Sequence, residues 1–537
     1  MAEMFSPAVF VLGTWHHALV NSNEPPDVSE SVFIQSVISR TDERLARLED
    51  EKLKLERMIN HLDDPWTCSC HTCPSKSQLQ DKLDLIAMDR LSLSNYRMRN
   101  KATLSPLRRM PAELLDEIFL WTCEFSNRRA LSRGKFDLVL PWVLTWVSSR
   151  WRAVAISSPS LWSLVLLDFS SQTPNMLPQY LLPLVEARIQ RSQKLRIHFY
   201  GSHATDARPQ TQMLELLSRH ASQWEELSIG IVPGIIPLLA SLRDRLTSLK
   251  RLWIQWEGSE SQKTECIDCF HTASSLVDVG IFNEYSFIPT TYPTHLLTRY
   301  QLDGPWKTHR GLLKAAPNLV EARIEISFDQ WEADSEEIVH LLLQRLYISH
   351  PNVLPSLTLP SLEGVAFWVA NEDNIDLPKL LASFVDRSAC PLQRLCLRGF
   401  PNAEALVQVL QRVPSIAELV IINSEPEAFE QINAIIKALT VSESRTVAPQ
   451  LRRLFFGCEE KTFVDYAAYL EMLRSRWKSA DCMLTGAALL IDSGPRPGRA
   501  TRRGLHALRL EGLDLVLAKG PQAGNDVYVW AYAVSWN

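Results

Sequence analysis

Leu392–Leu397 reads LQRLCL, Ile416–Ile421 reads IAELVI and Leu249–Ile254 reads LKRLWI. In each segment an apolar residue is followed, after two other residues, by two further apolar residues that flank a single intervening one. Side chains on a strand alternate between its two faces, so these last two residues share a face and predict a short strand with one buried side. The spacing recurs along the chain from about residue 190 onward. Its occurrences are Trp224/Leu227/Ile229, Leu249/Leu252/Ile254, Leu276/Val279/Ile281, Leu297/Tyr300/Leu302, Leu319/Ala322/Ile324, Leu343/Leu346/Ile348, Leu362/Val365/Phe367, Leu392/Leu395/Leu397, Ile416/Leu419/Ile421, Leu451/Leu454/Phe456 and Leu505/Leu508/Leu510.

These units follow one another at intervals of 19 to 30 residues as far as Leu419. Several gaps hold helical patterns, such as 213–219, 311–316 and 405–413. A strand and a helix in every 20 to 29 residues is typical of a leucine-rich repeat, whose strands join one parallel sheet. We therefore predict an α/β fold in which residues 169–537 form an irregular leucine-rich-repeat-like solenoid, less regular after residue 425. An ordinary α/β domain with coincidental repeats is the alternative.

Composition sets the scale of the molecule. The chain has 537 residues, of which 46% are hydrophobic and 22% charged. This length is more than one hydrophobic core usually supports, so we predict several domains. Its formal charge is 56 − 61 = −5, which gives no basic field for nucleic acid. Ten cysteines are too few for a disulfide scaffold and fit a reducing compartment, the cytoplasm or the nucleus. No apolar run is long enough for a membrane span, and residues 1–20 lack the pattern of a signal peptide.

The N-terminal part divides into a poorly ordered segment, 1–30, and a helical segment, 31–100. From Val32 to Leu62 apolar residues recur in steps of three and four, interrupted by Thr41 and Lys52. Such a stripe buries itself against another helix. The partner is either residues 77–97 of the same chain, in a helical hairpin, or a second copy in a coiled-coil dimer; a partly formed helix is the third possibility. The stripe consists of Ile34, Ile38, Leu45, Leu48, Leu55, Ile59 and Leu62.

Four soft metal ligands lie between these helical segments, at Cys68, Cys70, His71 and Cys73. A zinc site usually takes two ligand pairs held well apart in sequence, whereas these four are crowded into six residues. Metal binding and a disulfide remain alternatives to a plain connecting loop. We expect the loop, with no metal and no cofactor.

Residues 101–168 carry the most specific pattern in the chain. The segment 103–120 reads TLSPLRRMPAELLDEIFL, in which a proline precedes an acidic, amphipathic helical pattern. A second helical pattern follows at 144–154, and Ser158-Pro159-Ser160-Leu161-Trp162 ends it with a turn. The polar stretch from Glu124 to Val139 separates the two patterns. Two short helices and a proline turn are therefore expected here.

Together these segments resemble the F-box, and with the upstream heptad helix the chain is similar to the F-box-like family abundant in mushroom-forming fungi. The resemblance implies a three-helix module at 101–168 that docks on the Skp adaptor of a cullin-RING ubiquitin ligase. Two differences from that pattern are the longer stretch before Val139 and Ser148-Ser149 in place of a cysteine and a basic residue. The resemblance implies adaptor contacts at Leu107, Pro111, Leu114, Leu115, Ile118, Phe119, Leu144 and Val147, and a structural role for Trp151 and Trp162.

Catalytic motifs are missing from the sequence: it has no phosphate loop, no dinucleotide-binding glycine pattern, no zinc-protease motif and no nucleophile elbow. We expect no enzyme but a substrate receptor, in which the F-box binds the adaptor and the repeats bind an unidentified protein substrate. Ubiquitin transfer would then belong to the partner subunits. The alternative is an interaction scaffold that uses the solenoid without a ligase.

Overall fold

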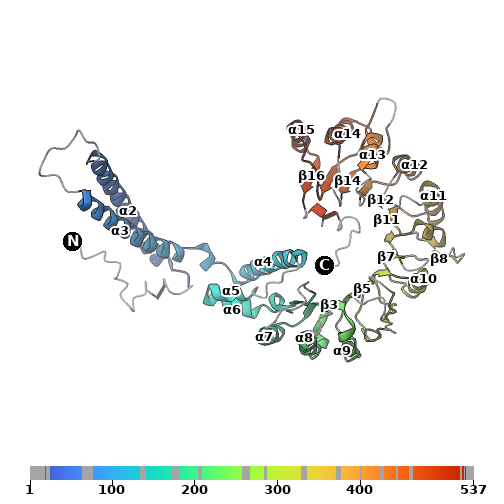
Figure 1. Ribbon diagram of the computed structural model, residues 1–537, viewed down its shortest axis with the longest axis horizontal. Coiled ribbons are helices and arrows are strands. Elements are labelled where there is room, and N and C mark those ends of the chain that lie inside the picture. Colours follow the sequence, from blue (N-terminus) through green and yellow to red (C-terminus); the bar gives the residue numbers. More distant parts are fainter. Residues whose placement is uncertain are drawn as a thin grey trace. The chain divides into compact units, whose positions relative to one another are not determined.

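The computed structural model describes residues 18–19, 24–62, 76–133, 141–170, 182–202, 208–256, 266–283, 287–327, 336–369, 376–399, 402–423, 429–442, 446–458, 464–520, 523–524 and 526–527. The chain forms two compact units, Met1–Leu161 and Trp162–Asn537. The first is helical and the second is built on a long sheet (Figure 1). The boundary differs from the expected one at residue 168, because the strand Leu164–Asp168 pairs with the sheet of the second unit.

The first unit consists of helices. Two long helices are followed by a 22-residue helix and four shorter helical elements. The elements are α2 (Val28–Leu62), α3 (Lys76–Thr103), η2 (Pro106–Arg108), α4 (Ala112–Arg133), α5 (Trp142–Val147), α6 (Ser149–Ser157) and η3 (Pro159–Trp162), the last ending at the first residue of the second unit.

Helix α2 begins at a reciprocal cap. The Glu30 backbone N–H donates to Asp27 Oδ1 at 2.7 Å, and the Asp27 N–H donates to Glu30 Oε2 at 2.8 Å. These hydrogen bonds satisfy donors that the start of the helix leaves without partners. The bond from the Glu30 N–H also lowers the pKa of the Asp27 carboxyl. The helix therefore starts at Val28, four residues before the heptad pattern indicates.

Helices α2 and α3 pack as an antiparallel hairpin. Arg90 pairs with Glu49 and Arg97 with Asp42, so a residue later in α3 contacts a residue earlier in α2. The chain itself thus covers the heptad stripe, as the hairpin alternative expected. Thr41, a polar position of that stripe, is buried, and its hydroxyl donates a hydrogen bond to the Val37 carbonyl oxygen at 2.7 Å. The apolar contact is formed by Leu48, Leu55, Leu79 and Ile86, with Ile59, Leu83 and Leu93 at its margin.

The second unit is a 14-stranded parallel sheet in which strands follow one another in sequence order, except that β8 and β10 form a separate two-stranded sheet. Helices α7 to α15 lie on its outer, convex side (Figure 1). The strands are β1 (Leu164–Asp168), β2 (Leu195–Tyr200), β3 (Trp224–Ile231), β4 (Arg251–Trp256), β5 (Asp278–Asn283), β6 (Arg299–Asp303), β7 (Glu321–Glu325), β8 (Ile338–Val339), β9 (Arg345–Ile348), β10 (Leu357–Thr358), β11 (Gly364–Val369), β12 (Arg394–Gly399), β13 (Glu418–Asn423), β14 (Arg453–Cys458), β15 (Gly486–Ile491) and β16 (Asp514–Lys519).

Helices or helical turns fill most of the connections between strands. Because strand neighbours are also chain neighbours, each repeat packs mainly against the repeats before and after it, as in a solenoid. The helices are α7 (Leu182–Arg191), α8 (Arg208–Ser218), α9 (Ile236–Ala240), α10 (Trp306–Ala315), α11 (Leu377–Ser388), α12 (Ala403–Arg412), α13 (Phe429–Leu439), α14 (Tyr466–Lys478) and α15 (Arg499–Leu510), with short turns η4 (Ala221–Gln223), η5 (Pro233–Ile235) and η6 (Pro351–Ser356).

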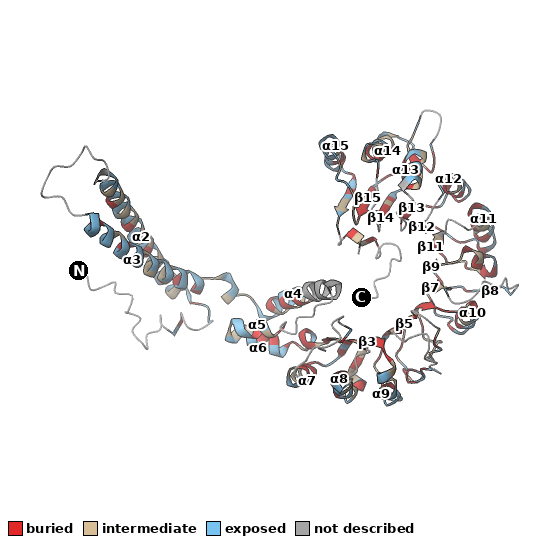
Figure 2. Cartoon of the chain, in the orientation of Figure 1, coloured by how far each residue is buried: buried red, intermediate tan, exposed pale blue. Residues whose placement is uncertain are grey.

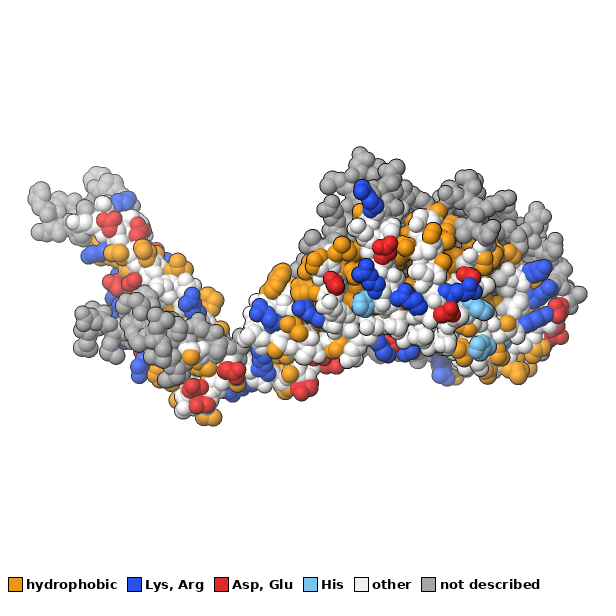
Figure 3. Space-filling model, turned by 90° about the horizontal axis from the view of Figure 1, so that it is seen from below, with side chains coloured by type: hydrophobic (Ala, Val, Ile, Leu, Met, Phe, Trp, Pro, Cys, Tyr) orange, Lys and Arg blue, Asp and Glu red, His pale blue; other side chains and the backbone are white. Residues whose placement is uncertain are grey.

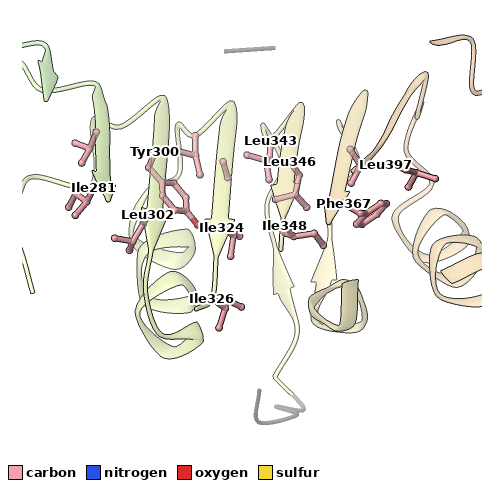
Figure 4. Packing of buried hydrophobic residues seen from close by; sticks show 14 of the residues in the cluster. Ile281, Tyr300, Leu302, Ile324, Ile326, Leu343, Leu346, Ile348, Phe367 and Leu397 are labelled. Atoms are coloured by element: carbon pink, nitrogen blue, oxygen red, sulfur yellow. The ribbon is translucent and has the colours of Figure 1, made fainter. Parts of the chain in front are cut away.

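Two apolar rows cross the sheet and form its core. Leu227 of β3 is in register with Leu252 of β4, and Ile229 with Ile254, and the rows continue strand by strand. Buried residues follow the strands from repeat to repeat (Figure 2). Figure 4 shows Ile281, Leu302, Ile324, Ile348, Phe367 and Leu397 side by side from successive strands. Burying one such side chain stabilises the fold by about 1.5–3 kcal/mol, so the rows account for the predicted spacing.

All but one of the predicted repeat units lie at strands of this sheet. The exception is Leu505/Leu508/Leu510, which belongs to helix α15, and the prediction of a strand there is wrong. Leu505 and Leu508 are buried, whereas Leu510 is 76% exposed, as a helical period requires. The sheet also continues through β15 and β16, which the repeat pattern did not indicate.

Candidate functional site

The predicted adaptor residues divide into exposed and buried sets. Pro111, at the start of α4, is exposed and accepts a hydrogen bond from the Leu115 N–H at 3.1 Å. Leu107, Leu114, Ile118 and Val147 are exposed, whereas Leu115, Phe119 and Leu144 are buried.

One face of α4 presents an apolar ridge, formed by Leu114, Ile118 and Trp121. These side chains are 53%, 44% and 71% exposed. Steps of four and three residues place them on one face of the helix. The sequence prediction did not include Trp121, although its position seven residues after Leu114 continues the same stripe.

The opposite face of α4 holds the module together. Leu115 and Phe119 are 1% and 0% exposed, and the Phe119 ring lies 4.8 Å from that of Trp151 on α6, centroid to centroid. These two side chains pack inside the chain, so of the predicted adaptor residues they are not part of the exposed surface. Leu144 of α5 is buried as well.

Helices α5 and α6 replace the single helix expected at 144–154. Ser148 has extended backbone angles (φ −163°, ψ 165°) and ends α5. Its hydroxyl accepts a hydrogen bond from the Trp151 N–H at 3.1 Å and caps α6. The serine that distinguishes this chain from the family pattern therefore begins the last helix of the module. Helix α5 exposes a second apolar patch formed by Val143, Trp146 and Val147, at 39%, 66% and 55%.

Arg150 fixes the turn that precedes α4. Its guanidinium donates to the carbonyl oxygens of Arg108 and Met110. Trp162, expected to hold the same module, is instead the first residue of the second unit, where the Arg191 guanidinium lies 4.5 Å above its ring. Helix α4 also differs from the short helix expected, since it runs on to Arg133 through the polar stretch.

The concave face of the sheet carries a row of charged residues that alternate in sign. The first face-exposed position of each strand is in register with the next, and we call this set the charge row. It comprises Glu226, Arg251, Asp278, Arg299, Glu321, Arg345, Gly364, Arg394, Glu418, Arg453, Gly486 and Asp514.

Adjacent members of the charge row form ion pairs. Arg299 binds Asp278 through two hydrogen bonds, of 3.0 and 2.7 Å, and Arg251 reaches the same carboxylate at 3.6 Å. Glu321 lies 3.8 Å from both Arg299 and Arg345. Burial, aided by the charge of Asp278, raises the pKa of the Glu321 carboxyl, although these two arginines lower it.

A hollow of about 440 Å³ opens on this face around Gly364, and we call it the Gly364 hollow. Gly364 and Ala366 leave the face of β11 almost bare between β9 and β12. The charged side chains that line the hollow are Arg323, Arg345, Arg394, Arg452, Arg453, Glu321, Glu363 and Glu418. Five arginines against three glutamates give it a formal charge of 5 − 3 = +2, in a chain whose net charge is −5.

Rings and small residues border the hollow. The Arg323 guanidinium lies 4.9 Å from the centroid of the Tyr347 ring, and farther along β11 and β12 the Arg398 guanidinium lies 4.6 Å from the centroid of the Trp368 ring. An apolar cluster begins in the lining of the hollow and continues along the same face toward the end of the sheet. Its members are Tyr347, Ala366, Cys396, Val420, Ile422, Leu490, Ala523 and Val527.

An acidic pair, Asp303 and Glu325, lies at the ends of β6 and β7. Asp303 is 5% exposed, and burial together with the charge of Glu325 raises the pKa of its carboxyl to about 6. The Ser327 N–H donates to Asp303 Oδ1 at 3.1 Å, and Asn283 Nδ2 donates to the Asp303 carbonyl at 3.0 Å. Asn283 ends β5 and Asp303 ends β6, so this hydrogen bond joins one repeat to the next.

Charges elsewhere are mixed. On the face shown in Figure 3, Lys and Arg side chains are interspersed with Asp and Glu rather than gathered in one field. Within the described ranges, no three His, Cys, Asp or Glu side chains are grouped as metal ligands would be. Cys68, Cys70, His71 and Cys73 lie outside these ranges. None of the described helices combines the length and hydropathy that crossing a bilayer requires.

Comparison with known proteins gives a distant structural similarity. No family model matches the chain, and no curated protein matches it. Among solved structures, the crystal structure of a TLR13–ssRNA13 complex is similar over 66% of this chain, with 13% sequence identity and a TM-score of 0.30. The chain spans 54% of that protein's length. At this TM-score the similarity adds nothing to the argument from the strands themselves.

Proposed function

We propose that this protein is a substrate receptor of a Skp–cullin–F-box ubiquitin ligase. Its first unit would dock the Skp adaptor through the exposed faces of α4 and α5, and its sheet would hold a protein substrate on the concave face. Ubiquitin transfer would be catalysed by the partner subunits, and this chain would supply proximity and orientation. Such a ligase would work in the cytoplasm or the nucleus.

The observation that carries the proposal is the ridge on α4. Leu114, Ile118 and Trp121 leave a tryptophan and two aliphatic side chains in water, on a helix whose other face is anchored in the module. Exposed apolar groups that converge on one helix face mark interaction sites, and tryptophan is enriched among the residues that dominate binding. The ridge also lies in the segment whose sequence resembles the F-box.

The test is binding of the purified full-length chain to purified Skp adaptor by calorimetry. Leu114→Asp combined with Ile118→Asp should abolish binding, because the interface would bury two unpaired carboxylates. Both positions are about half exposed, so the variant should unfold at the same temperature as the wild type. A matched control is Leu85→Asp with Leu91→Asp on α3, where the side chains are 63% and 65% exposed.

The proposal predicts micromolar or tighter binding by the wild type and the α3 control, and loss of binding by the α4 variant. Absence of binding by the wild type at micromolar concentration would overturn the receptor assignment. Equal binding by the α4 variant would show that the ridge is not the docking site.

One observation favours a second function, that of a scaffold without a ligase. Helix α4 has 22 residues and continues to Arg133, well beyond the short helix that the F-box resemblance implies. In that case the concave face of the sheet would still bind a protein, and the calorimetric titration with adaptor would show no heat of binding.

A further inference from the structure

The charge row has a break at Gly364. In the middle of the row the carboxylates Asp278, Glu321 and Glu418 each lie between two arginines: Arg251 and Arg299 approach Asp278 at 3.6 and 2.7 Å. Arg394 and Arg453 approach Glu418 in the same way, at 2.8 and 3.9 Å. If the alternation of charge continued, an acidic residue would stand between Arg345 and Arg394. The residue in register with both is Gly364.

The break has room for a side chain. Neighbouring strands lie about 4.8 Å apart, so Arg345 and Arg394 start about 10 Å from each other, as do the two arginines that share Asp278. A Cβ atom at Gly364 would meet only the Cβ and Cδ of Arg394, at 3.6 and 3.9 Å, which are ordinary van der Waals distances. The Arg345 side chain is 54% exposed, so the position is open to a partner.

We propose that the Gly364 hollow receives the carboxylate of an aspartate or glutamate side chain of a bound protein, which completes the charge row. This inference rests on the part of the proposed function that assigns the concave face to a protein partner, and not on adaptor docking. The five arginines and three glutamates that line the hollow leave an excess of positive charge, which attracts an anionic group. The row itself uses carboxylates at the equivalent positions.

The first test supplies the carboxylate from the chain itself. Gly364→Asp places an acid between Arg345 and Arg394, and Gly364→Asn places a neutral group of the same shape there. The aspartate variant should unfold at a temperature about 2 °C or more above the asparagine variant, and the difference should shrink in 1 M NaCl. An aspartate variant no more stable than the asparagine variant would overturn the proposal.

Gly486 provides a matched control. It occupies the other break of the charge row, with similar space, since its Cβ would meet Asp514 and Arg453 atoms at 3.6–3.9 Å. Its register neighbours are Arg453 and Asp514, so an added acid would face one arginine and one carboxylate. Gly486→Asp should therefore gain no stability over Gly486→Asn. An equal gain at both glycines would overturn the assignment of a special site to Gly364.

The second test measures binding of a fluorescein-labelled hexaglutamate peptide to the full chain in low salt, by anisotropy and without adaptor. The wild type should bind it at least tenfold more tightly than a hexaglutamine peptide, and Gly364→Asp should weaken binding at least tenfold. Inorganic phosphate at the same concentration should not compete. Equal binding to wild type and Gly364→Asp, or stronger competition by phosphate than by acetate, would overturn the carboxylate assignment. Because the adaptor is not present, failure here and failure of adaptor docking are separate results.

Discussion

The ion pair between Asp278 and Arg299 allows the energetic contribution of the charge row to be measured. The pair forms two hydrogen bonds, at 3.0 and 2.7 Å, and its side chains are only 8% and 27% exposed. Burial lowers the pKa of the Arg299 guanidinium, but the hydrogen bonds and charge of Asp278, together with the charge of Glu321, outweigh burial and raise it. The double-mutant cycle uses Asp278→Asn, Arg299→Met and the two combined, so that each change removes charge with little change in size.

The coupling free energy between Asp278 and Arg299 should lie between two limits. Exposed pairs couple by about 0.2–1 kcal/mol, and removing one member of a fully buried pair costs about 3–5 kcal/mol. For a bidentate pair that is mostly buried we expect a coupling of about 2 kcal/mol. Arg243 and Asp268, 3.4 Å apart and about half exposed, form the control pair, with an expected coupling below about 0.5 kcal/mol.

Urea unfolding followed by circular dichroism gives the four free energies of each cycle. The Asp278–Arg299 coupling should persist largely in 1 M NaCl, because burial limits screening, whereas the control coupling should vanish. A coupling for Asp278–Arg299 no larger than that of the control would refute the reasoning, and would mean that the charge row contributes nothing to stability beyond ordinary surface pairs.

Three further predictions concern other parts of the second unit. Arg476, fully buried, donates to the carbonyls of Leu439, Val447 and Ala448, so Arg476→Met should lower the free energy of unfolding by about 3 kcal/mol; a loss below about 1 kcal/mol would contradict this. The folded-state pKa of Asp303 is about 6 against an ordinary 3.8, so the free energy of unfolding falls as pH rises from about 4 to about 6 and stays lower above that. Asp303→Asn should therefore raise the free energy of unfolding by roughly 1–2 kcal/mol over the wild type at pH 7.5 and leave it unchanged near pH 4. An equal rise at both pH values in urea unfolding would refute this prediction. Ala389 ends α11 in the left-handed region (φ 49°), so Ala389→Gly should stabilise by about 0.5 kcal/mol and raise the urea midpoint, and a lower midpoint would show that this backbone carries no strain.

Local spacing was enough to locate most strands of the sheet. In Leu392–Leu397 the last two apolar residues fall on one face of a strand whatever the neighbours are, and β12 is found there. The same spacing failed at Leu505–Leu510, because residues three apart also share a helix face, and only packing against the sheet decides between the two. Strand β15, GAALLI, was missed although Leu484, Ala487 and Leu489 have the same spacing, because glycine and two alanines make its apolar pattern weak.

The sequence predicted the apolar residues Leu114 and Ile118 of α4 but not which of its apolar side chains are exposed. Leu114 and Leu115 are adjacent and equally apolar, but one is 53% and the other 1% exposed, because the helix is rotated so that Phe119 meets Trp151. Long-range packing sets that rotation. The hairpin of α2 and α3 was an open alternative for the same reason, since a heptad stripe specifies a partner helix without saying which chain supplies it.

The sequence by itself determined where the repeats lie and that their strands bury one side, since both follow from the local period of apolar residues. It did not determine the charge row. Arg345, Gly364 and Arg394 are separated by 19 and 30 residues, and nothing local relates them. Only the register of the parallel sheet brings them onto adjacent strands, and with them the break in the alternation of charge that forms the Gly364 hollow.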